Sequence, residues 1–368
     1  MSEPTVLVHL IEPAQWRAAL AAGAVRPPSL EAVGFVHLST PEQVHVPARA
    51  LHPGRRDLAL LVVDPARLTD PVRFEPGHPE DPAGMRFPHL YGPLPVATVV
   101  AVVAYRPPSP LVLPEPADAR GRALALQTSL PVRRAVGVGD VPGGVAVLDP
   151  DVPHSRDNNR LLLTRPVDAG TVEAAAAEVA GNAGWPHQAA ALMWPDAAGV
   201  AADLAGRGWH TEELLLMARR PGPGGDPARA EVVDQREVHA FWTRSWRREL
   251  PADRHRDDVV AQLVAREHRS DRVVAAHDVV VREDGRVLAA GQLRVDGATA
   301  SVESVATDPA ARGRGHADAV LARLLGLAAE AGCDLVVLEA AADDWPRHWY
   351  ARRGFAVVGS TWSADRPA

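Results

Sequence analysis

The chain has no lysine, so all 39 of its positively charged side chains are arginines. Its single cysteine, Cys333, excludes a disulfide framework and a thiolate metal site and is expected to lie in the core. No hydrophobic run approaches a membrane span and no charged-then-apolar leader opens the chain, so we expect neither a membrane segment nor secretion. The net charge of −7 argues against a nucleic-acid-binding surface. These absences favour a cytoplasmic enzyme, and nothing in the sequence indicates its oligomeric state.

Two proline-rich segments divide the chain. Residues 107–120 (PPSPLVLPEPADAR) and 219–228 (RRPGPGGDPA) are too rich in Pro and Gly to continue a helix or strand or to bury a core. They leave three segments, 1–106, 121–218 and 229–368, and a chain of 368 residues is expected to form two or three domains.

The third segment contains a glycine-rich turn, RGRGHA at residues 312–317, between a predicted strand and a predicted helix. The alternating β-branched pattern of residues 298–309 indicates the strand, and the apolar spacing of residues 319–328 indicates the helix. Free backbone N–H groups and the helix dipole favour an anion at such a helix start, and Gly313 and Gly315 allow a pyrophosphate to approach the backbone. The spacing fits neither the dinucleotide fingerprint nor the P-loop, so an ordinary strand–helix turn is the alternative.

The elements after this turn complete a longer pattern. A second strand is predicted at 334–340, a short helix at 345–352 and a third strand at 353–359. The order strand, Arg-x-x-Gly-x-Ala turn, helix, strand, helix ending in Tyr-x-x-x-Gly-Phe, and strand resembles the GNAT acyltransferase superfamily over residues 229–364. In that superfamily the turn holds the pyrophosphate of acetyl-CoA, and the preceding strand splays from its neighbour and pairs with the pantetheine arm.

The resemblance therefore implies an acetyl-CoA site on this segment. Asp343 or Asp344 replaces the Asn that the superfamily frequently has before its last helix, and His316 is expected to open the helix after the turn. The implied cofactor-binding residues are Val305, Ala306, Thr307, Arg312, Gly313, Arg314, Gly315, His316, Ala317 and Asp344.

Two residues are implied to be catalytic. Tyr350 stands where the superfamily has its usual general acid, and a phenol with a pKa near 10 suits protonation of a departing thiolate. Glu303 lies in the strand before the turn, where many members carry a carboxylate that deprotonates the amine, often through water. Alternation places Glu303 on the same face as Ser301 and Val305. A core tyrosine and a surface glutamate are the structural alternatives.

The middle segment repeats the end of the third one. The run from Ala202 to Trp209 and its following strand have the same form as the run from Trp349 to Phe355 and its strand. Aligning the two Arg-Gly-aromatic triplets places Leu204 at the position of Tyr350. The segment resembles a degenerate GNAT half without phosphate turn or acid, and is expected to pack against the catalytic half and wall the acceptor cleft. An unrelated α/β segment with the same ending is the alternative.

The first segment carries histidines on separate predicted strands, at 6–10 and 34–40, and a third motif, FPHLYG, at 87–92. It resembles an uncharacterised bacterial family with an ADP-ribosyltransferase-like fold, and its His-Leu-Ser element is similar to that of the NAD-binding tRNA 2′-phosphotransferases. Glu75 is the candidate for the glutamate of protein-modifying relatives. Structural histidines or a three-histidine metal site are alternatives, although no HxH or HxxxH pair supports a metal. The resemblance implies a cleft with possible NAD binding that comprises His9, His37, Ser39, His89 and Tyr91.

These patterns predict an α/β (α+β) chain with tandem GNAT-type mixed sheets flanked by helices, preceded by a small α+β ADP-ribosyltransferase-like domain. The resemblance implies direct transfer of an acetyl group from acetyl-CoA to a primary amine of a small molecule or protein, with specificity set by loops within about 242–272. A non-catalytic CoA or NAD sensor and an NAD-dependent transferase in 1–106 are the alternatives. The intact Tyr350 and Arg312 turn favour the acyltransferase.

Overall fold

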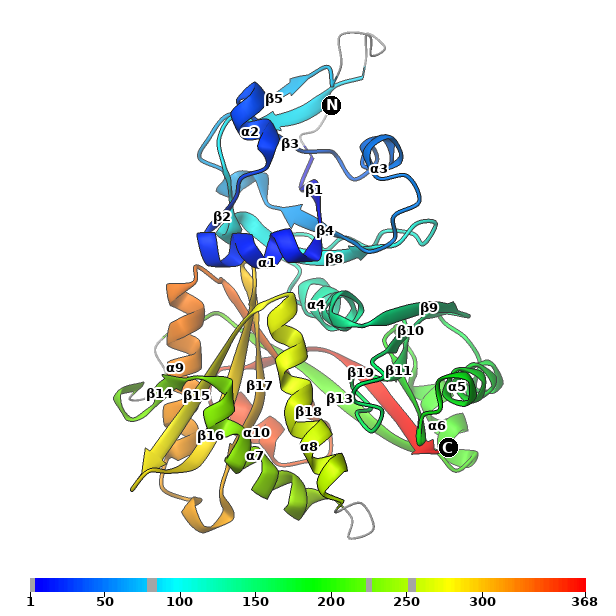
Figure 1. Cartoon of the computed structure of the whole chain (residues 1–368), viewed down its shortest axis with the longest axis vertical. Coiled ribbons are helices and arrows are strands. Elements are labelled where there is room, and N and C mark those ends of the chain that lie inside the picture. The colour runs from blue at the N-terminus through cyan, green and yellow to red at the C-terminus, as the bar shows by residue number, and fades with distance from the viewer. Residues whose placement is uncertain (1–3, 78–84, 223–226, 251–255) are drawn as a thin grey trace.

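The structure is a computed structural model that describes residues 4–77, 85–222, 227–250 and 256–368. A small N-terminal unit lies at one end of the long axis, and a larger unit built on one continuous sheet forms the rest (Figure 1). The glycine-rich centre of the predicted linker 219–228 lies outside the described residues. None of the described helices is long and apolar enough to cross a membrane.

The N-terminal unit has the small α+β architecture that was predicted. Its central strand, β4 (Leu58–Val63), is buried along its whole length between β1 (Leu7–Ile11) and β8 (Val99–Tyr105) in an antiparallel sheet. The apolar run LALLVV explains this placement, because a strand between two others tolerates apolar residues on both faces. The remaining elements are α1 (Pro13–Ala22), β2 (Ala24–Val25), α2 (Pro28–Val33), β3 (Val36–His37), α3 (His45–Leu51), β5 (Val72–Glu75), β6 (Phe87–Leu90) and β7 (Leu94–Pro95).

Two similar halves form the larger unit. The first half comprises α4 (Ala119–Arg134), β9 (Gly137–Val141), β10 (Gly144–Leu148), β11 (Arg160–Leu163), α5 (Ala169–Ala183), β12 (His187–Leu192), α6 (Ala198–Gly206) and β13 (His210–Arg219). The second half comprises β14 (Glu231–Val233), α7 (Gln235–Glu249), α8 (Asp257–Ala265), β15 (Ala275–Glu283), β16 (Arg286–Asp296), β17 (Thr299–Thr307), α9 (His316–Glu330), β18 (Leu335–Ala341), α10 (Pro346–Ala351) and β19 (Ala356–Pro367).

The two halves exchange their last strands. The sheet order is β14-β15-β16-β17-β18-β13-β19-β12-β11-β10-β9. Strand β13 of the first half therefore pairs with β18 of the second, and β19 of the second half pairs with β12 of the first. The edge strand β14 has no counterpart. Each other strand has one in the other half: β15 matches β9, β16 matches β10, β17 matches β11, β18 matches β12, and β13 matches β19. Matched strands lie at equal distances from the centre of the sheet. The sheet thus has an approximate two-fold axis between β13 and β19.

The predicted repeat of the Arg-Gly-aromatic triplets is confirmed in atomic detail. The backbone N–H of Trp209 donates to the carbonyl of Leu204 at 3.1 Å, and that of Phe355 donates to Tyr350 at 3.2 Å. The glycines before the two aromatic residues have φ of 84° and 82°, the left-handed conformation that ends a helix. Leu204 is fully buried at the position equivalent to Tyr350, so this half has no phenol there.

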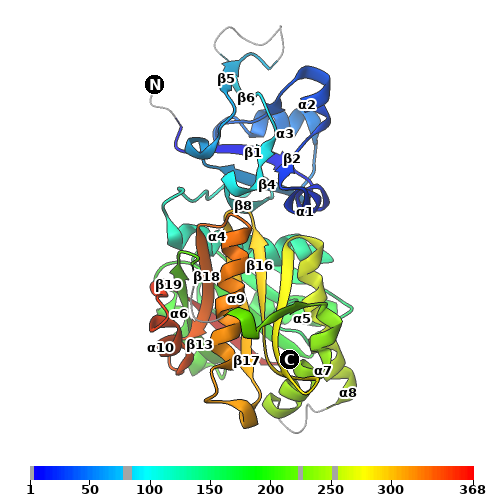
Figure 2. The ribbon, with the colours of Figure 1, turned by 90° about the vertical axis from the view of Figure 1, so that its left-hand side faces the viewer.

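Helices cover both faces of the second half. Helix α9 packs on one face of β15 and β16, where it covers strand residues such as Val279 and Leu293 (Figure 2). Helix α7 packs on the other face, where its Phe241 packs with Val280 and Ala290. These two strand residues point away from the face of Val279 and Leu293, because side chains alternate along a strand. This leaves the start of α9 beside the end of β17, where the glycine-rich turn connects them.

The N-terminal unit contacts the second half through polar bonds at the turn between β16 and β17. The backbone N–H of Ala298 donates to the carbonyl of Val99 at 2.7 Å. The indole N–H of Trp16 donates to the carboxylate of Asp296 at 2.7 Å, and both side chains are buried. Gly297 is required here, because a Cβ at this position would lie 2.3 Å from the carbonyl oxygen of Val99.

Candidate active site

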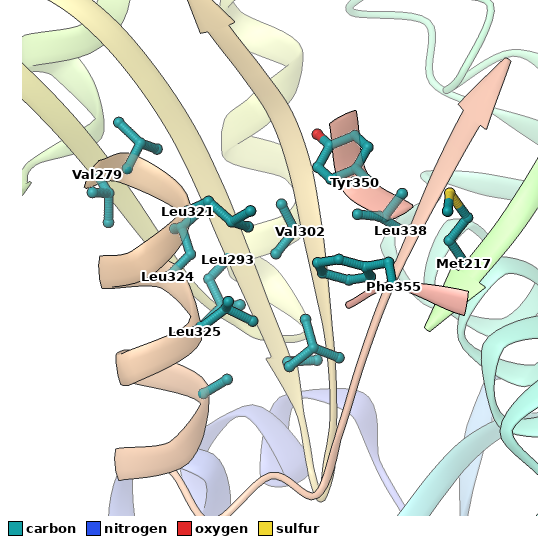
Figure 3. Close-up of a cluster of buried hydrophobic side chains, with 14 of the residues drawn as sticks. Met217, Val279, Leu293, Val302, Leu321, Leu324, Leu325, Leu338, Tyr350 and Phe355 are labelled. Atoms are coloured by element: carbon teal, nitrogen blue, oxygen red, sulfur yellow. The ribbon is translucent and has the colours of Figure 1, made fainter. Parts of the chain in front are cut away.

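Strands β17 and β18 separate along their length and open a gap in the sheet. Their parallel pairing covers only Thr299–Ser301 opposite Leu335–Val337. Beyond this point the two strands diverge as a V, with Val302 on one arm and Leu338 on the other (Figure 3). The backbone groups of β17 that face this gap have no strand beside them in the described chain. An extended ligand can therefore pair with this edge.

A β-bulge lies in β17 where the gap begins. Ala290 pairs with Ala306 and Gln292 pairs with Glu303, so Ser304 and Val305 both stand opposite Gly291. Ser304 has φ of 54°, and a Cβ on Gly291 would lie 2.9 Å from Val320, so glycine permits the close packing. The predicted alternation is therefore wrong for Val305. Its side chain packs with Val302 on the α9 side, whereas Glu303 faces the other side, because the extra residue reverses the alternation.

The glycine-rich turn has the conformation that its sequence requires. Gly313 and Gly315 have φ of 76° and 78°, and the space beside each Cα is open to 4 Å. Helix α9 begins at His316, as predicted, and His316 is buried with a pKa lowered first by that burial and then by Arg314. Arg312 is exposed, whereas Arg314 binds Glu283 at 2.7 Å. The open turn at a helix N-terminus is suited to a phosphate group.

A cleft of about 730 Å³ connects this turn with the gap between the strands. It brings together nine predicted residues: Val305, Ala306, Thr307, Arg312, Gly313, Gly315, His316, Ala317 and Tyr350. Its lining does not include two other predicted residues. Arg314 turns to Glu283, and the Asp344 carboxylate accepts a bond from the backbone N–H of Trp345 at 2.7 Å.

Nine lining residues of the cleft were not predicted as site residues. They are Ser245, Arg248 and Glu249 at the end of α7, Pro309, Ala311 and Asp318 around the glycine-rich turn, and Trp345, Pro346 and Trp349 at the start of α10 and within it. The side chain of Trp345 is 64% exposed, which is unusual for an indole on a folded surface. The available signal in the sequence was the two tryptophans within the predicted helix 345–352. Residues 245–249 lie in the region 242–272 that was predicted to form specificity loops, but the structure forms helix α7 there, and its tertiary packing brings its end to this cleft.

Tyr350 occupies the inner end of the cleft. Its ring is buried and packs edge-on against Trp349 and Phe355, with ring centroids 4.8 and 5.6 Å away. Its hydroxyl points away from Phe355, toward β17 (Figure 3). Burial, and then the negative charge of Glu303, raise the pKa of the phenol. Tyr350 therefore stays protonated at neutral pH and has a proton to donate.

A second, smaller cavity of about 100 Å³ lies on the Glu303 side of the bulge. Residues of both halves line it, and the Glu303 carboxylate is 3.7 Å from the guanidinium of Arg294. The first half contributes to a wall beside Glu303, and its predicted role at the acceptor cleft stays a prediction. The lining residues are Leu126, Gln127, Leu130, Pro131, Arg134, Asp157, Asn158, Arg160, Arg266, Glu267, Arg294, Glu303, Ser304 and Glu339.

Glu339 is a second carboxylate of this cavity that sequence reasoning missed. It lies on β18, opposite β17 across the gap, and accepts a bond from the hydroxyl of Thr361 at 3.3 Å. Burial raises its pKa to about 7, which places it near the pKa of an effective general base at neutral pH. The available signal was a charged residue inside the apolar run LVVLEAA.

The first half lacks an equivalent phosphate turn. Between β11 and α5 the residues TRPVD (164–168) carry no glycine. The pattern Arg-x-x-Gly-x-Gly does occur once in this half, from Arg134 to Gly139, but these residues lie at the end of α4 and in β9. A strand follows rather than a helix, so the pattern provides no helix N-terminus for an anion.

The predicted residues of the N-terminal unit form a cluster. The ring of His9 lies 2.8 Å from the carbonyl of His37, and the ring of His89 lies 5.1 Å from that of His37. The Glu75 carboxylate accepts a bond from Tyr91 at 2.8 Å and lies 3.2 Å from His89. The backbone of Ser39 pairs with that of Val8, the residue before His9, and this pairing places Ser39 beside the cluster. Within the described residues, no three His, Cys, Asp or Glu side chains gather as a metal site.

Family models match two parts of the chain. Residues 236–355 match the acetyltransferase (GNAT) family, and residues 10–102 match a protein family of unknown function, DUF952. Among curated proteins, a probable glucosamine 6-phosphate N-acetyltransferase 2 of Oryza sativa subsp. japonica is 39% identical over 95 residues. That alignment covers 23% of this chain and 56% of the rice protein.

Solved structures similar to parts of the chain include two from bacteria. A GCN5-related N-acetyltransferase from Kribbella flavida is 20% identical, with 68% of this chain and 96% of that chain covered and a TM-score of 0.46. Protein CC0527 from Caulobacter crescentus is 32% identical, with 27% of this chain and 83% of that chain covered and a TM-score of 0.24.

Proposed function

Because residues 236–355 are a GNAT domain, we propose that this chain transfers an acetyl group from acetyl-CoA to a primary amine by direct attack. The supporting observation is the arrangement of two cavities on either side of the β17 bulge. The large cleft leads from the phosphate turn to Tyr350, and the small cavity presents Glu303 and Glu339. A thioester in the cleft and an amine in the cavity would meet at the gap between β17 and β18.

The cleft has the features needed to bind acetyl-CoA. The backbone N–H groups at the start of α9 and the guanidinium of Arg312 would bind the pyrophosphate. Arg248 supplies a further positive charge at the cleft wall. The free edge of Val305–Thr307 would pair with the amides of the pantetheine arm, and a strand N–H near Thr307 would polarise the thioester carbonyl.

The chemical step needs one base and one acid. Glu303, directly or through water, takes a proton from the amine, whose nitrogen then forms a bond to the carbonyl carbon. Tyr350 gives its proton to the sulfur as the carbon–sulfur bond breaks, which avoids release of a free thiolate. The products are the N-acetyl amide and CoA. Glu339 shares the cavity with Glu303 and is an alternative proton acceptor.

The acceptor is an amine of a small molecule or of a protein. The rice relative is named for an amino-sugar phosphate, which is one small acceptor to test. Within the variable region 242–272, Arg266 and Glu267 reach the small cavity, so this region contributes to the acceptor site. The limited volume of that cavity favours a compact acceptor.

Acetyl-CoA titration of the full chain, followed by an assay of CoA thiol release with a panel of amines, tests this function. We expect saturable acetyl-CoA binding and thiol release that depends on an amine. Binding without amine-dependent thiol release would contradict the proposal and favour the non-catalytic sensor.

NAD binding by residues 1–106 stays a prediction that none of the comparisons supports. If His37 lines a nucleotide cleft, His37→Ala should weaken NAD binding with little change in melting temperature. A structural histidine would instead lower the melting temperature, because its hydrogen-bond partners would be left unsatisfied. Saturation-transfer NMR of the full chain with NAD and ADP-ribose distinguishes the two.

A further inference from the structure

The small cavity beside Glu303 contains four arginines, of which two have close carboxylate partners. Arg266 lies 2.8 Å from Asp157 and 3.0 Å from Glu267. Arg294 lies 2.8 Å from Glu267 and 3.7 Å from Glu303. The Arg266–Asp157 pair joins the two halves and the other three lie within the second half; together they fix the walls of the cavity, because a buried ion pair is costly to break.

The other two arginines, Arg134 and Arg160, are poorly compensated. Arg134 is 7% exposed and donates to neutral oxygens, the Ser270 hydroxyl at 3.0 Å and the Asp157 carbonyl at 3.3 Å. Arg160 lies 3.6 Å from Asp157, a carboxylate that Arg266 already holds more closely. The Nε–H groups of both are buried and have no acceptor among the described residues. Burial, and then Arg294, lower the pKa of Arg134 to about 10, and the nearby carboxylates of Asp157 and Glu267 offset this only in part.

Glu339 is a carboxylate that makes no close ion pair with the described residues; it accepts a bond from Thr361, and Arg160 is the first positive charge that acts on it. The cavity therefore presents groups of both signs whose charges are only partly compensated. Such charges are expensive to bury unless a ligand compensates them. The end of α4 favours a cation at Arg134 through the helix dipole, but it supplies no counter-charge and does not reach Arg160 on β11.

We propose that this cavity binds a small primary amine that also carries an anionic group, a carboxylate or a phosphate, and that Arg134 and Arg160 of the first half hold that anion. The amine then lies beside Glu303 and Glu339, next to the gap through which it attacks the thioester. This assignment rests on the proposed acetyl transfer and specifies its acceptor. It also gives the half without a phosphate turn a role in substrate recognition.

The test compares acceptors that share one aminoethyl group. Ethanolamine is neutral beyond its amine, β-alanine carries a carboxylate, and O-phosphoethanolamine carries a phosphate. With the full chain and saturating acetyl-CoA, we expect kcat/KM for at least one anionic acceptor to exceed that for ethanolamine by roughly 10-fold or more, the effect of one charge-assisted hydrogen bond. The better of the two anionic acceptors identifies the anion.

Single substitutions distinguish a loss of acceptor recognition from a general loss of activity or stability. Arg160→Gln should lower kcat/KM for the preferred anionic acceptor by roughly 10- to 100-fold, mainly through KM, and lower that for ethanolamine by a clearly smaller factor. Arg134→Gln should act the same way, and Arg160→Gln serves alone where that buried change impairs folding. The control is Arg207→Gln, which removes an exposed arginine of the first half that pairs with Glu173 far from the cavity lining.

The outcomes distinguish this inference from the function on which it rests. Acetylation of ethanolamine as fast as of β-alanine and O-phosphoethanolamine, or equal losses for all three in Arg160→Gln, would overturn the anion assignment and leave acetyl transfer intact. Acetyl-CoA binding without thiol release for any amine would overturn both.

Discussion

Tyr350 serves two purposes with one side chain. Its ring belongs to the core between α9 and the sheet, while its hydroxyl reaches the cleft. The equivalent Leu204 serves only the core, which shows that packing at this position does not require a hydroxyl. Replacing the hydroxyl alone therefore separates chemistry from stability.

Tyr350→Phe should keep acetyl-CoA affinity and the melting temperature close to those of the parent, because the ring contacts are retained. It should lower kcat by roughly 10²- to 10⁴-fold, the usual contribution of a general acid. Steady-state thiol release and calorimetry measure the two effects, with Tyr91→Phe in the N-terminal unit as control. Unchanged turnover in Tyr350→Phe would exclude the phenol as the acid.

Gly315→Val should weaken acetyl-CoA binding by at least roughly 10-fold, about 1.4 kcal/mol, because the side chain would occupy the phosphate site. Gly285→Val is a matched control. Gly285 has φ of 75° and open space around it, like Gly315, but lies in the hairpin between β15 and β16. Both variants carry the same backbone strain of roughly 1–3 kcal/mol. Equal CoA affinity in the two, measured by calorimetry, would mean that the turn is only structural.

The sequence placed some site residues correctly and misplaced or missed others. The turn residues and Tyr350 stand at fixed offsets from a strand and a helix, so the motif was sufficient to predict their place in the cleft, except for Arg314, which pairs with Glu283. Val305 was assigned to the wrong face, because the bulge depends on Gly291 of a neighbouring strand packing against Val320. Glu339 was missed because its role arises only from the gap across which it faces β17.

At the scale of elements, the strands of the second half carry two acidic groups with raised pKa values, the buried Asp278 and the partly buried Glu339. Glu339 on β18 and Asp278 on β15 both have a pKa of about 7, in each case chiefly because of burial. Asp278 accepts a bond from the Gln292 amide at 3.2 Å, and Gln292 in turn accepts one from Arg294 at 2.8 Å. The sheet therefore links Asp278 to the charged cavity.

These groups make stability fall as pH rises through the window from about 4 to 7. Well below it, both groups are protonated in the folded and unfolded chain. Within it, the unfolded chain ionises while the folded chain does not, so stability is progressively lost as pH approaches the folded pKa. Glu339→Gln should flatten this slope and raise the unfolding free energy at pH 8 by up to roughly 3 kcal/mol.

Urea unfolding at several pH values checks this expectation. Asp278→Asn is the matched comparison, since it removes the other group that titrates in the same window. A Glu339→Gln variant with the parent's pH slope would show that Glu339 ionises normally.

Across the whole molecule, one buried carboxylate, Asp296, connects the N-terminal unit with both halves of the larger unit. Asp296 at the end of β16 accepts from Trp16 of α1 and binds Arg133 of α4, and the Asp296 and Arg133 side chains are 2% and 1% exposed. Three segments that are remote in sequence thus meet at one carboxylate. Composition and motifs predicted the parts but could not predict this contact or the strand exchange, because both depend on which sheet edges meet.

Asp296→Ala should lower the unfolding free energy by about 3–5 kcal/mol, because it leaves Arg133 buried without a counter-charge. Asp257→Ala is the control, since the Asp257 side chain is 85% exposed and its pair with Arg247 is worth less than about 1 kcal/mol. Denaturant titration gives both values. Similar losses in the two variants would mean that Asp296 does not hold the units together.

The exchange of β13 and β19 also constrains the order in which the protein can be assembled during synthesis. Strand β12 leaves the ribosome with its residues 187–192 long before its neighbour β19, residues 356–367, has been translated. Until then β12 and β13 carry unpaired backbone edges, which can pair with other chains. Closing contacts so far apart in the sequence is slow, because a long loop must be ordered first. The nascent chain therefore needs protection from aggregation until almost its last strand has emerged, and the two halves complete their folding together rather than one after the other.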